Sequence, residues 1–228
     1  MAIEKKKIYQ NKIQYKWIYD TIISKLYDFG LKIGLMGHER ILRVSVFDAV
    51  STYIKKGDHV LDLCCGTGTL TVLLTKLFYS DCKIVGVDLS SGQINQAQKK
   101  NIYPNLEFKV MDANYLEFPN EIFDIVIISA ALHEMNKVQR LNVLSEIYRV
   151  LKREGYFLIF DHHEPSKTSL RVLYNFYLGF SEKILSKSAE MQRNILMELK
   201  RTKFKIISQT PVRKFFNFFQ VILCKKES

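Results

Sequence analysis

Glycine and acidic residues are spaced in one stretch of the chain as a nucleoside-binding site requires. Gly66 and Gly68 follow a short apolar run that ends at Cys64, and they precede a segment with helical spacing. Glycines in such a turn let the backbone bend sharply and approach a ligand closely. Asp88 ends the next apolar run, where a carboxylate can accept hydrogen bonds from two ribose hydroxyls. The pattern therefore predicts a nucleoside site.

A dinucleotide site is the first alternative, and the sequence argues against it. Such a site uses a third glycine, where the helix packs closely and its N-terminus faces a pyrophosphate. Thr71 stands at that position, and no Gly-Lys-Ser or Gly-Lys-Thr ending follows. The turn is therefore expected to hold a nucleoside that carries no phosphates.

Three histidines are candidates for acid–base chemistry. His133 follows the apolar run 123–129 and can act as a general base, or it can cap the loop or bond to Glu134; both interpretations stay open. His162 and His163 follow a later apolar run. Because adjacent histidines cannot easily ligate one ion together, we expect no metal site.

Alternating strands and helices are expected to position these residues. Strands are predicted at 59–64, 83–88, 106–111, 123–129 and 156–161. Helices are predicted at 69–79, 91–101 and 137–151, with Gly155 ending the last one. The run 123–129 is apolar throughout, as is typical of a central parallel strand covered on both faces. This rhythm predicts an α/β fold with a doubly wound, mostly parallel sheet.

The two ends of the chain have other patterns. Helices are predicted at 13–33, 38–55 and within 167–201. Late strands at 204–209 and 218–224 are separated by a short loop around Pro211, so they should be antiparallel. We expect a single domain over 1–228, made of an N-terminal helical lid (1–55), a cofactor-binding core (56–165), and a helical insert with a late β-hairpin (166–228).

The composition limits the classes of protein to consider. No apolar run reaches the roughly 18 residues that a membrane span needs, and the N-terminus lacks the apolar core of a secretory signal, so a cytoplasmic protein is expected. The four cysteines include no Cys-x-x-Cys pair, which disfavours a zinc site. The net charge of +11 has three interpretations: nucleic-acid binding, peripheral contact with an anionic membrane, or solubility alone.

Five sequence landmarks, in order, resemble those of the class I S-adenosylmethionine (SAM)-dependent methyltransferases. Over roughly residues 55–165 they are Val60-Leu-Asp-Leu-Cys-Cys-Gly-Thr-Gly68, Val85-Gly-Val-Asp-Leu-Ser90, Met111-Asp-Ala113 with Leu116-x-Phe-Pro119, Phe123-Asp-Ile-Val126, and Arg149-Val-Leu-Lys-x-x-Gly155. Lys25-Leu-Tyr-Asp28 with Gly37-His-Glu-Arg40 resembles the leading helices of the ubiquinone/menaquinone C-methyltransferase group. The chain departs from the family at Cys64-Cys65 and at Lys152-Arg-Glu154, and both departures are expected to be tolerated.

The resemblance implies SAM as cofactor, S-adenosylhomocysteine as product, and a seven-stranded sheet with an antiparallel last strand. It implies that Asp62 and the backbone of 66–68 hold the methionine end of SAM, and that Asp88 binds the ribose. Leu89 would pack on the adenine, and Asp112 would accept a hydrogen bond from its amino group. The implied cofactor-binding set is Tyr27, Asp62, Cys64, Gly66, Gly68, Asp88, Leu89, Met111, Asp112, Ala113 and Ser129, with Ser129 near the transferred methyl group.

The acceptor is expected to be a small lipophilic molecule such as a quinone precursor, because the C-terminal part is rich in aromatic residues that can roof an apolar pocket. The expected pocket residues are His38, His133, His162, Tyr174 and Tyr177. A phospholipid N-methyltransferase and an RNA or other nucleic-acid methyltransferase are the alternatives. Nucleic acid is less expected, because Ser129-Ala-Ala-Leu132 stands where those enzymes carry Asn-Pro-Pro-Tyr or Asp-Pro-Pro-Tyr.

Overall fold

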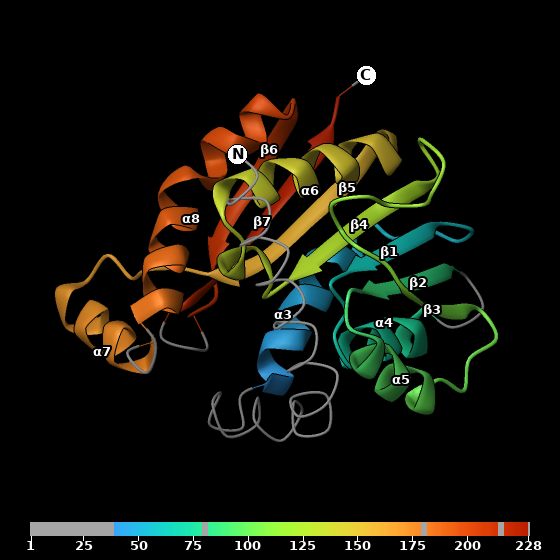
Figure 1. The fold of residues 1–228 in the computed structure, drawn as a ribbon, viewed down its shortest axis with the longest axis horizontal. Helices are drawn as coiled ribbons and strands as arrows, with labels where there is room; N and C mark the ends of the chain where they lie inside the picture. The colour runs from blue at the N-terminus through green and yellow to red at the C-terminus, as the bar shows by residue number, and fades with distance from the viewer. Residues whose placement is uncertain (1–38, 79–81, 179–181, 214–216, 228) are drawn as a thin grey trace, which may run out of the picture.

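The computed structural model describes residues 39–78, 82–178, 182–213 and 217–227 (Figure 1). The predicted helix at 13–33 lies outside these residues, as do Tyr27 and His38. The second predicted helix is present as α3 (Glu39–Ser51). Among the described residues, no helix is both long enough and apolar enough to cross a membrane.

One sheet runs through the described part of the chain. Its seven strands are ordered β3-β2-β1-β4-β5-β7-β6. β3, β2, β1, β4 and β5 pair in parallel, and β7 is antiparallel to both of its neighbours. The strands are β1 (His59–Leu63), β2 (Lys83–Asp88), β3 (Leu106–Val110), β4 (Phe123–Ser129), β5 (Leu151–His162), β6 (Phe204–Pro211) and β7 (Phe219–Lys226). The predicted mostly parallel sheet and the antiparallel late hairpin are confirmed.

Helices cover both faces of the sheet, as Figure 1 shows. They are α4 (Thr69–Leu77), α5 (Ser91–Lys100), the short 3₁₀ helix η2 (Leu132–Glu134), α6 (Lys137–Val150), α7 (Thr168–Leu178) and α8 (Glu182–Arg201). The central strand β4 explains this arrangement. Ile125 and Ile127 belong to the core under α3, α4 and α5, whereas Val126 and Ile128 belong to the core under α6 and α8. An apolar strand needs cover on both faces.

The prediction that Gly155 ends a helix is wrong. The helix α6 ends at Val150, and β5 begins at Leu151, so that Gly155 lies inside a 12-residue strand. Phe123 pairs with Leu151 but Ile125 pairs with Tyr156, which leaves extra residues of β5 bulged out. A Cβ atom on Gly155 would lie 2.9 Å from the Asp124 carbonyl oxygen. The glycine therefore permits a close backbone approach in a bulge rather than a helix end.

The late hairpin also differs in detail from its prediction. Pro211 was expected in the connecting loop, but it is the last residue of β6 and pairs with Gln220 of β7. Proline is tolerated there because β6 is the edge strand of the sheet.

Candidate active site

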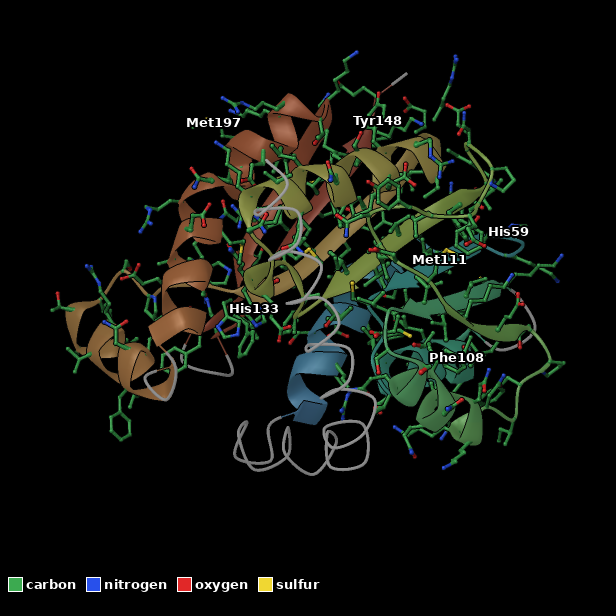
Figure 2. The ribbon with its side chains drawn as sticks, in the orientation of Figure 1. His59, Phe108, Met111, His133, Tyr148 and Met197 are labelled. Carbon is green, nitrogen blue, oxygen red and sulfur yellow. The ribbon has the colours of Figure 1, made fainter. Side chains whose placement is uncertain are left out.

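The ends of four neighbouring strands carry most of the candidate residues. Because β2, β1, β4 and β5 are adjacent and parallel, their carboxyl ends lie along the same edge of the sheet. Asp88 ends β2, Cys64 follows β1, Ser129 ends β4, and Asp161 is the second-last residue of β5. Figure 2 shows His133 near this edge and His59, at the start of β1, at the opposite end of the sheet. Residues distant in sequence are thus brought to one edge.

The glycine turn is held in a compact form. Gly66 and Gly68 both have left-handed backbones, with φ of 56° and 70°. A Cβ atom on Gly68 would lie 2.5 Å from the Phe108 ring and 2.8 Å from the Ala97 side chain. The absence of a side chain at Gly68 therefore lets the start of α4 pack closely against α5 and β3. The residues next to Gly68 offer backbone N–H groups at the start of this helix.

Asp88 ties the turn to the end of β2. Its Oδ2 atom accepts the backbone N–H of Gly66 and its Oδ1 atom accepts that of Ser90, each at 2.9 Å. The two carboxylate oxygens thus hold the start of the glycine turn and the start of α5. Asp88, the residue predicted to bind a ribose, is therefore fixed to the glycine turn.

The backbone conformation of Cys64 was not predicted from the sequence. Its φ is 60°, in the left-handed region that favours glycine. Burial raises the pKa of the Cys64 and Cys65 thiols well above the ordinary value, and the neighbouring Asp88 and Asp62 add to the effect. Both thiols therefore stay protonated and poorly nucleophilic.

Asp62 lies beneath α4. The residue is 1% exposed, and its Oδ2 atom accepts a hydrogen bond from the Thr71 hydroxyl at 2.6 Å. Burial raises its pKa to about 7, although the Thr71 hydrogen bond opposes this and the charge of Asp88 reinforces it. Thr71, which replaces the third glycine of dinucleotide sites, thus has a definite role. It supports an acidic residue next to the turn.

The predicted adenine turn packs beside β2. The backbone N–H of Met111 donates to the Asp88 carbonyl at 2.9 Å, and the side chains of Met111 and Ala113 are buried. The Oδ1 atom of Asp112 accepts the backbone N–H and the side-chain amide of Asn114, at 3.0 and 2.8 Å. The turn therefore places Asp112 close to Asp88, and Leu89, next to Asp88, is half-buried.

One buried acceptor in this region has no protein partner. Gln93 lies in the first turn of α5, which begins just after Asp88, and is 1% exposed. Its Oε1 atom makes no hydrogen bond to the protein. Buried polar atoms are normally satisfied, so this orphan next to the Asp88 turn fits a site completed by a bound molecule with hydrogen-bond donors. A nucleoside has such donors.

A second set of residues lies at the ends of β4 and β5. The Nδ1 atom of His133 is 2.8 Å from Oδ1 of Asp161. The Oδ2 atom of Asp161 accepts the backbone N–H groups of Leu132 and His133, and its Oδ1 atom also accepts that of His162. Ala130, with φ 52°, turns the chain out of β4 so that His133 returns to β5. The structure therefore gives His133 a partner, Asp161, that the sequence analysis did not name.

The carboxylate of Asp161 is poised to orient this histidine. Burial alone would raise the pKa of Asp161, but the charge and hydrogen bond of His133, together with His162, hold it below the ordinary value. An ionised carboxylate can only accept, so Nδ1 of His133 donates its N–H to Asp161. This is the arrangement in which a carboxylate orients a general base.

His162 and Tyr174 complete this cluster. Both are buried, and the His162 ring centroid lies 4.3 Å from that of His133 and 6.2 Å from that of Tyr174. Burial lowers the pKa of His162 to about 3, and the charge of His133 contributes to the shift. Of the predicted acceptor residues, His162 thus contacts the predicted base, and Tyr174 contacts His162. The side chain of Tyr177 lies outside the described residues.

The same cluster is the group among the described residues that could hold a metal ion, since ligand atoms of His133, Asp161 and His162 all lie within 4.8 Å of one another. Asp161, however, already receives four hydrogen bonds from N–H groups. The donor pattern therefore fits a histidine–carboxylate pair better than a metal centre.

Asp161 is a candidate site residue that the site prediction omitted. A signal for it existed in the sequence, because it is the acidic residue at the end of the apolar strand run Phe157–Phe160. Strand β5 pairs with β4, whose end leads to His133. Two polar residues that follow adjacent parallel strands are expected to meet.

Known proteins are similar to this chain in sequence and in fold. Residues 60–155 match a family model described as a methyltransferase domain. A demethylmenaquinone methyltransferase of Lactobacillus johnsonii is 31% identical over 173 residues, which cover 73% of this chain and 69% of that protein. A ubiquinone/menaquinone biosynthesis C-methyltransferase of Coxiella burnetii is 25% identical over 193 residues, covering 81% and 75%. The crystal structure of a SAM-dependent methyltransferase from Methanosarcina mazei has the same fold, with a TM-score of 0.63, 19% identity and coverage of 78% and 97%.

Proposed function

The chain belongs to the class I SAM-dependent methyltransferases, and from this premise we propose that it methylates a small lipophilic acceptor of the quinol type, with His133 as the general base. SAM is the cofactor and, when bound, supplies an electrophilic methyl group. The observation that carries the proposal is the hydrogen bond of 2.8 Å between His133 and Asp161 at the strand edge that also holds Asp88.

The residues around the glycine turn and the end of β2 fit the nucleoside part of SAM. Asp88 offers carboxylate oxygens to ribose hydroxyls, and Asp112 and the orphan Gln93 Oε1 offer acceptors to further donors. Asp62 and the backbone of 66–68 are proposed to hold the charged methionine end. Ser129, Cys64, Leu89, Met111 and Ala113 are proposed to complete the cofactor site.

The second set supplies the chemistry of the acceptor. Asp161 holds the N–H of His133 at Nδ1, so that Nε2 can take a proton from an acceptor hydroxyl as the methyl group is transferred. The rings of His162, Phe219 and Phe160 form a buried row beside the base, with centroid distances of 4.9 and 5.2 Å, and we propose that this row forms one wall of the acceptor site. Such a lining suits a flat ring better than a charged polymer. The name of the Lactobacillus johnsonii relative, demethylmenaquinone methyltransferase, points to the same class of acceptor.

The acceptor class is tested by offering the purified protein labelled SAM with a short-chain demethylated naphthoquinol, with phosphatidylethanolamine vesicles, or with bulk RNA. Label in the quinol, lost when His133 is replaced by Gln, supports the proposal. Label confined to phosphatidylethanolamine or RNA would replace it by one of the two alternatives. The His59→Gln variant is the matched control, because His59 lies at the other end of the sheet (Figure 2).

We also propose peripheral contact with an anionic membrane through α7. Val172 and Phe176 are 67% and 75% exposed, and helical spacing places them opposite the buried Tyr174. Residues 167–187 contain four lysine or arginine residues and one acidic residue, which complements anionic lipid. Phe176→Ser should reduce sedimentation with phosphatidylglycerol vesicles, whereas Ile102→Ser, at another exposed apolar residue, should not. Equal sedimentation of the two variants would contradict this contact.

A further inference from the structure

A chain of buried polar groups leads from α8 to the ring of His162. The hydroxyl of Tyr174, which is 2% exposed, lies 3.4 Å from Nδ1 of His162 and 3.2 Å from the Ser188 hydroxyl. The Nε2 atom of Gln192 donates to the Tyr174 hydroxyl at 2.8 Å. These groups come from β5, α7 and α8, so the chain links the helical insert to the site.

The contact between Gln192 and Glu164 indicates which groups donate in this series of hydrogen bonds. The backbone N–H of Glu164 donates to Oε1 of Gln192, which fixes the amide so that its NH₂ group faces Tyr174. The Tyr174 oxygen therefore already accepts a hydrogen bond. Its own proton can be donated to the Ser188 hydroxyl at 3.2 Å or to Nδ1 of His162 at 3.4 Å. Ser188 also accepts from Gln192, and we take Nδ1 of His162 as the acceptor of the Tyr174 proton. A neutral imidazole that accepts at Nδ1 carries its proton at Nε2.

The surroundings of His162 keep it uncharged. Among the described residues, His133 of η2 and Asp161 of β5 are titratable groups on one side of His162, and Tyr174 of α7 lies on the other. Helix α8 contributes the uncharged Ser188 and Gln192, and β7 contributes the Phe219 ring at 4.9 Å. With a pKa of about 3, His162 cannot take the proton from its neighbour His133 at neutral pH.

We propose that Tyr174, oriented by Gln192, is a positioning residue that locks His162 as a neutral imidazole with its proton on Nε2. The two histidines then have different roles toward the acceptor, and this part of the inference rests on the proposed function. His133 accepts a proton, and His162 directs an N–H away from α7 and toward the oxygen of an acceptor. Imidazole nitrogens of the pair lie within 4.8 Å of each other, within reach of one small functional group.

This pairing selects a class of acceptor. A hydrogen-bond donor beside a proton acceptor stabilises the developing anion of a phenol or enol oxygen. The same donor gives no help to an amine, which attacks through its lone pair as a neutral group and develops positive charge. The site is therefore suited to hydroxyl-bearing rings, for either O- or C-methylation, and ill suited to an ethanolamine headgroup.

The protonation of His162 can be measured without any acceptor, by long-range ¹H–¹⁵N correlation spectra of the full-length protein between pH 5 and 8. The expected result is a single neutral form of His162 with its proton on Nε2. In Tyr174→Phe the spectrum should show a mixture of the two neutral forms. Tyr148→Phe, in α6, is the matched control and should leave His162 unchanged.

Two results would overturn the proposal. One is a wild-type His162 that carries its proton on Nδ1 or titrates near pH 6, which needs no variant to be folded. The other is a Tyr174→Phe spectrum identical to that of the wild type. If the spectra agree with the proposal but no quinol is methylated, the proposed function fails and the locked histidine stands.

Turnover provides the second readout where an acceptor is active. Tyr174→Phe should lower kcat by roughly three- to tenfold, as expected for the loss of one hydrogen bond, and should leave the affinity for SAM unchanged. Gln192→Leu should act in the same direction, because it removes the donor that orients Tyr174. A purely structural role would lower thermal stability without changing the protonated nitrogen of His162.

Discussion

The side chains of His133 and Asp161, 28 residues apart in the sequence, meet at 2.8 Å where β4 and β5 end. The pairing assigns each group a distinct task. Asp161 orients the ring, and the proposed function makes His133 the base. Replacing Asp161 by Asn should let the ring adopt the other neutral form, which would lower kcat by roughly 10²-fold or more, with little change in SAM affinity. Steady-state kinetics and calorimetry on the same variant measure the two effects separately.

Asp88 should decide cofactor affinity. Asp88→Ala removes the acceptor for ribose hydroxyls and also the partner of the Gly66 and Ser90 N–H groups, so binding of S-adenosylhomocysteine should weaken by roughly 10²-fold. Asp88→Asn, which keeps one oxygen, should fall between that variant and the wild type. Near-unchanged affinity of the alanine variant by calorimetry would show that the cofactor site lies elsewhere.

Cys64 should be a site of stored backbone strain. A non-glycine residue in the left-handed region costs roughly 1–2 kcal/mol, and glycine pays no such cost. Cys64→Gly is expected to raise the free energy of unfolding by up to about 1 kcal/mol once the greater flexibility of the unfolded chain is offset. Cys64→Ala keeps the strain and loses the thiol, so it should not stabilise the protein. If both variants behave alike in thermal unfolding, the strain argument is wrong.

Asp62 should make stability depend on pH. Its pKa is about 7 in the folded protein, whereas an aspartate in an unfolded chain titrates near 4. The folded state therefore binds the proton more tightly, and this contribution is fully present below pH ~4 and is lost as pH rises through about 7. Asp62→Asn should flatten the decline in the melting temperature between pH 5 and 8. Asp48→Asn, at an exposed aspartate, should leave the slope unchanged.

The buried ion pair of Arg140 and Glu198 should fix α8 to α6 and to the loop that carries His133. Arg140 is fully buried, binds both carboxylate oxygens of Glu198 at 2.8 and 2.9 Å, and donates to the Met135 carbonyl. Glu198→Gln leaves a buried charge partly compensated by Glu190 and should cost about 3 kcal/mol in chemical denaturation.

A control for the ion pair is available at the surface. The exposed pair Lys109–Glu107 should be worth less than about 1 kcal/mol, so Glu107→Gln should be nearly neutral. The apolar double substitution Arg140→Met with Glu198→Leu should be less destabilising than Glu198→Gln, since it removes both charges. A double variant as unstable as the single one would argue against the ion pair as the cause.

Most of the fold could be predicted from local sequence patterns, and the errors of the prediction have physical causes. The bounds of β2 and β4 were predicted to the residue, because apolar strands between polar turns have unambiguous ends. The prediction for Gly155 was wrong because Leu151 pairs with Phe123, a residue distant in the sequence. This pairing makes the segment that resembled a helix end part of a strand. Likewise, the left-handed backbone of Cys64 arises from how the turn closes on Asp88, which no residue type reveals.

The candidate site divides in the same way. Asp88 and the glycine turn could be predicted because their spacing is local to one strand–turn–helix unit and its successor. Asp161 could not be assigned to His133 without the adjacency of β4 and β5, although each residue was visible at the end of its own strand. The network from Gln192 through Tyr174 to His162 depends on how α7 and α8 pack, and the sequence pattern contains no signal for it.

Methyl transfer from labelled SAM to a short-chain demethylated naphthoquinol, by the wild type and by His133→Gln, tests the central claim most directly. At saturating SAM, the account predicts labelled quinone product from the wild type and a rate lower by roughly 10²-fold or more from the variant, with unchanged binding of S-adenosylhomocysteine. A His133→Gln protein that methylates the quinol at the wild-type rate would contradict it.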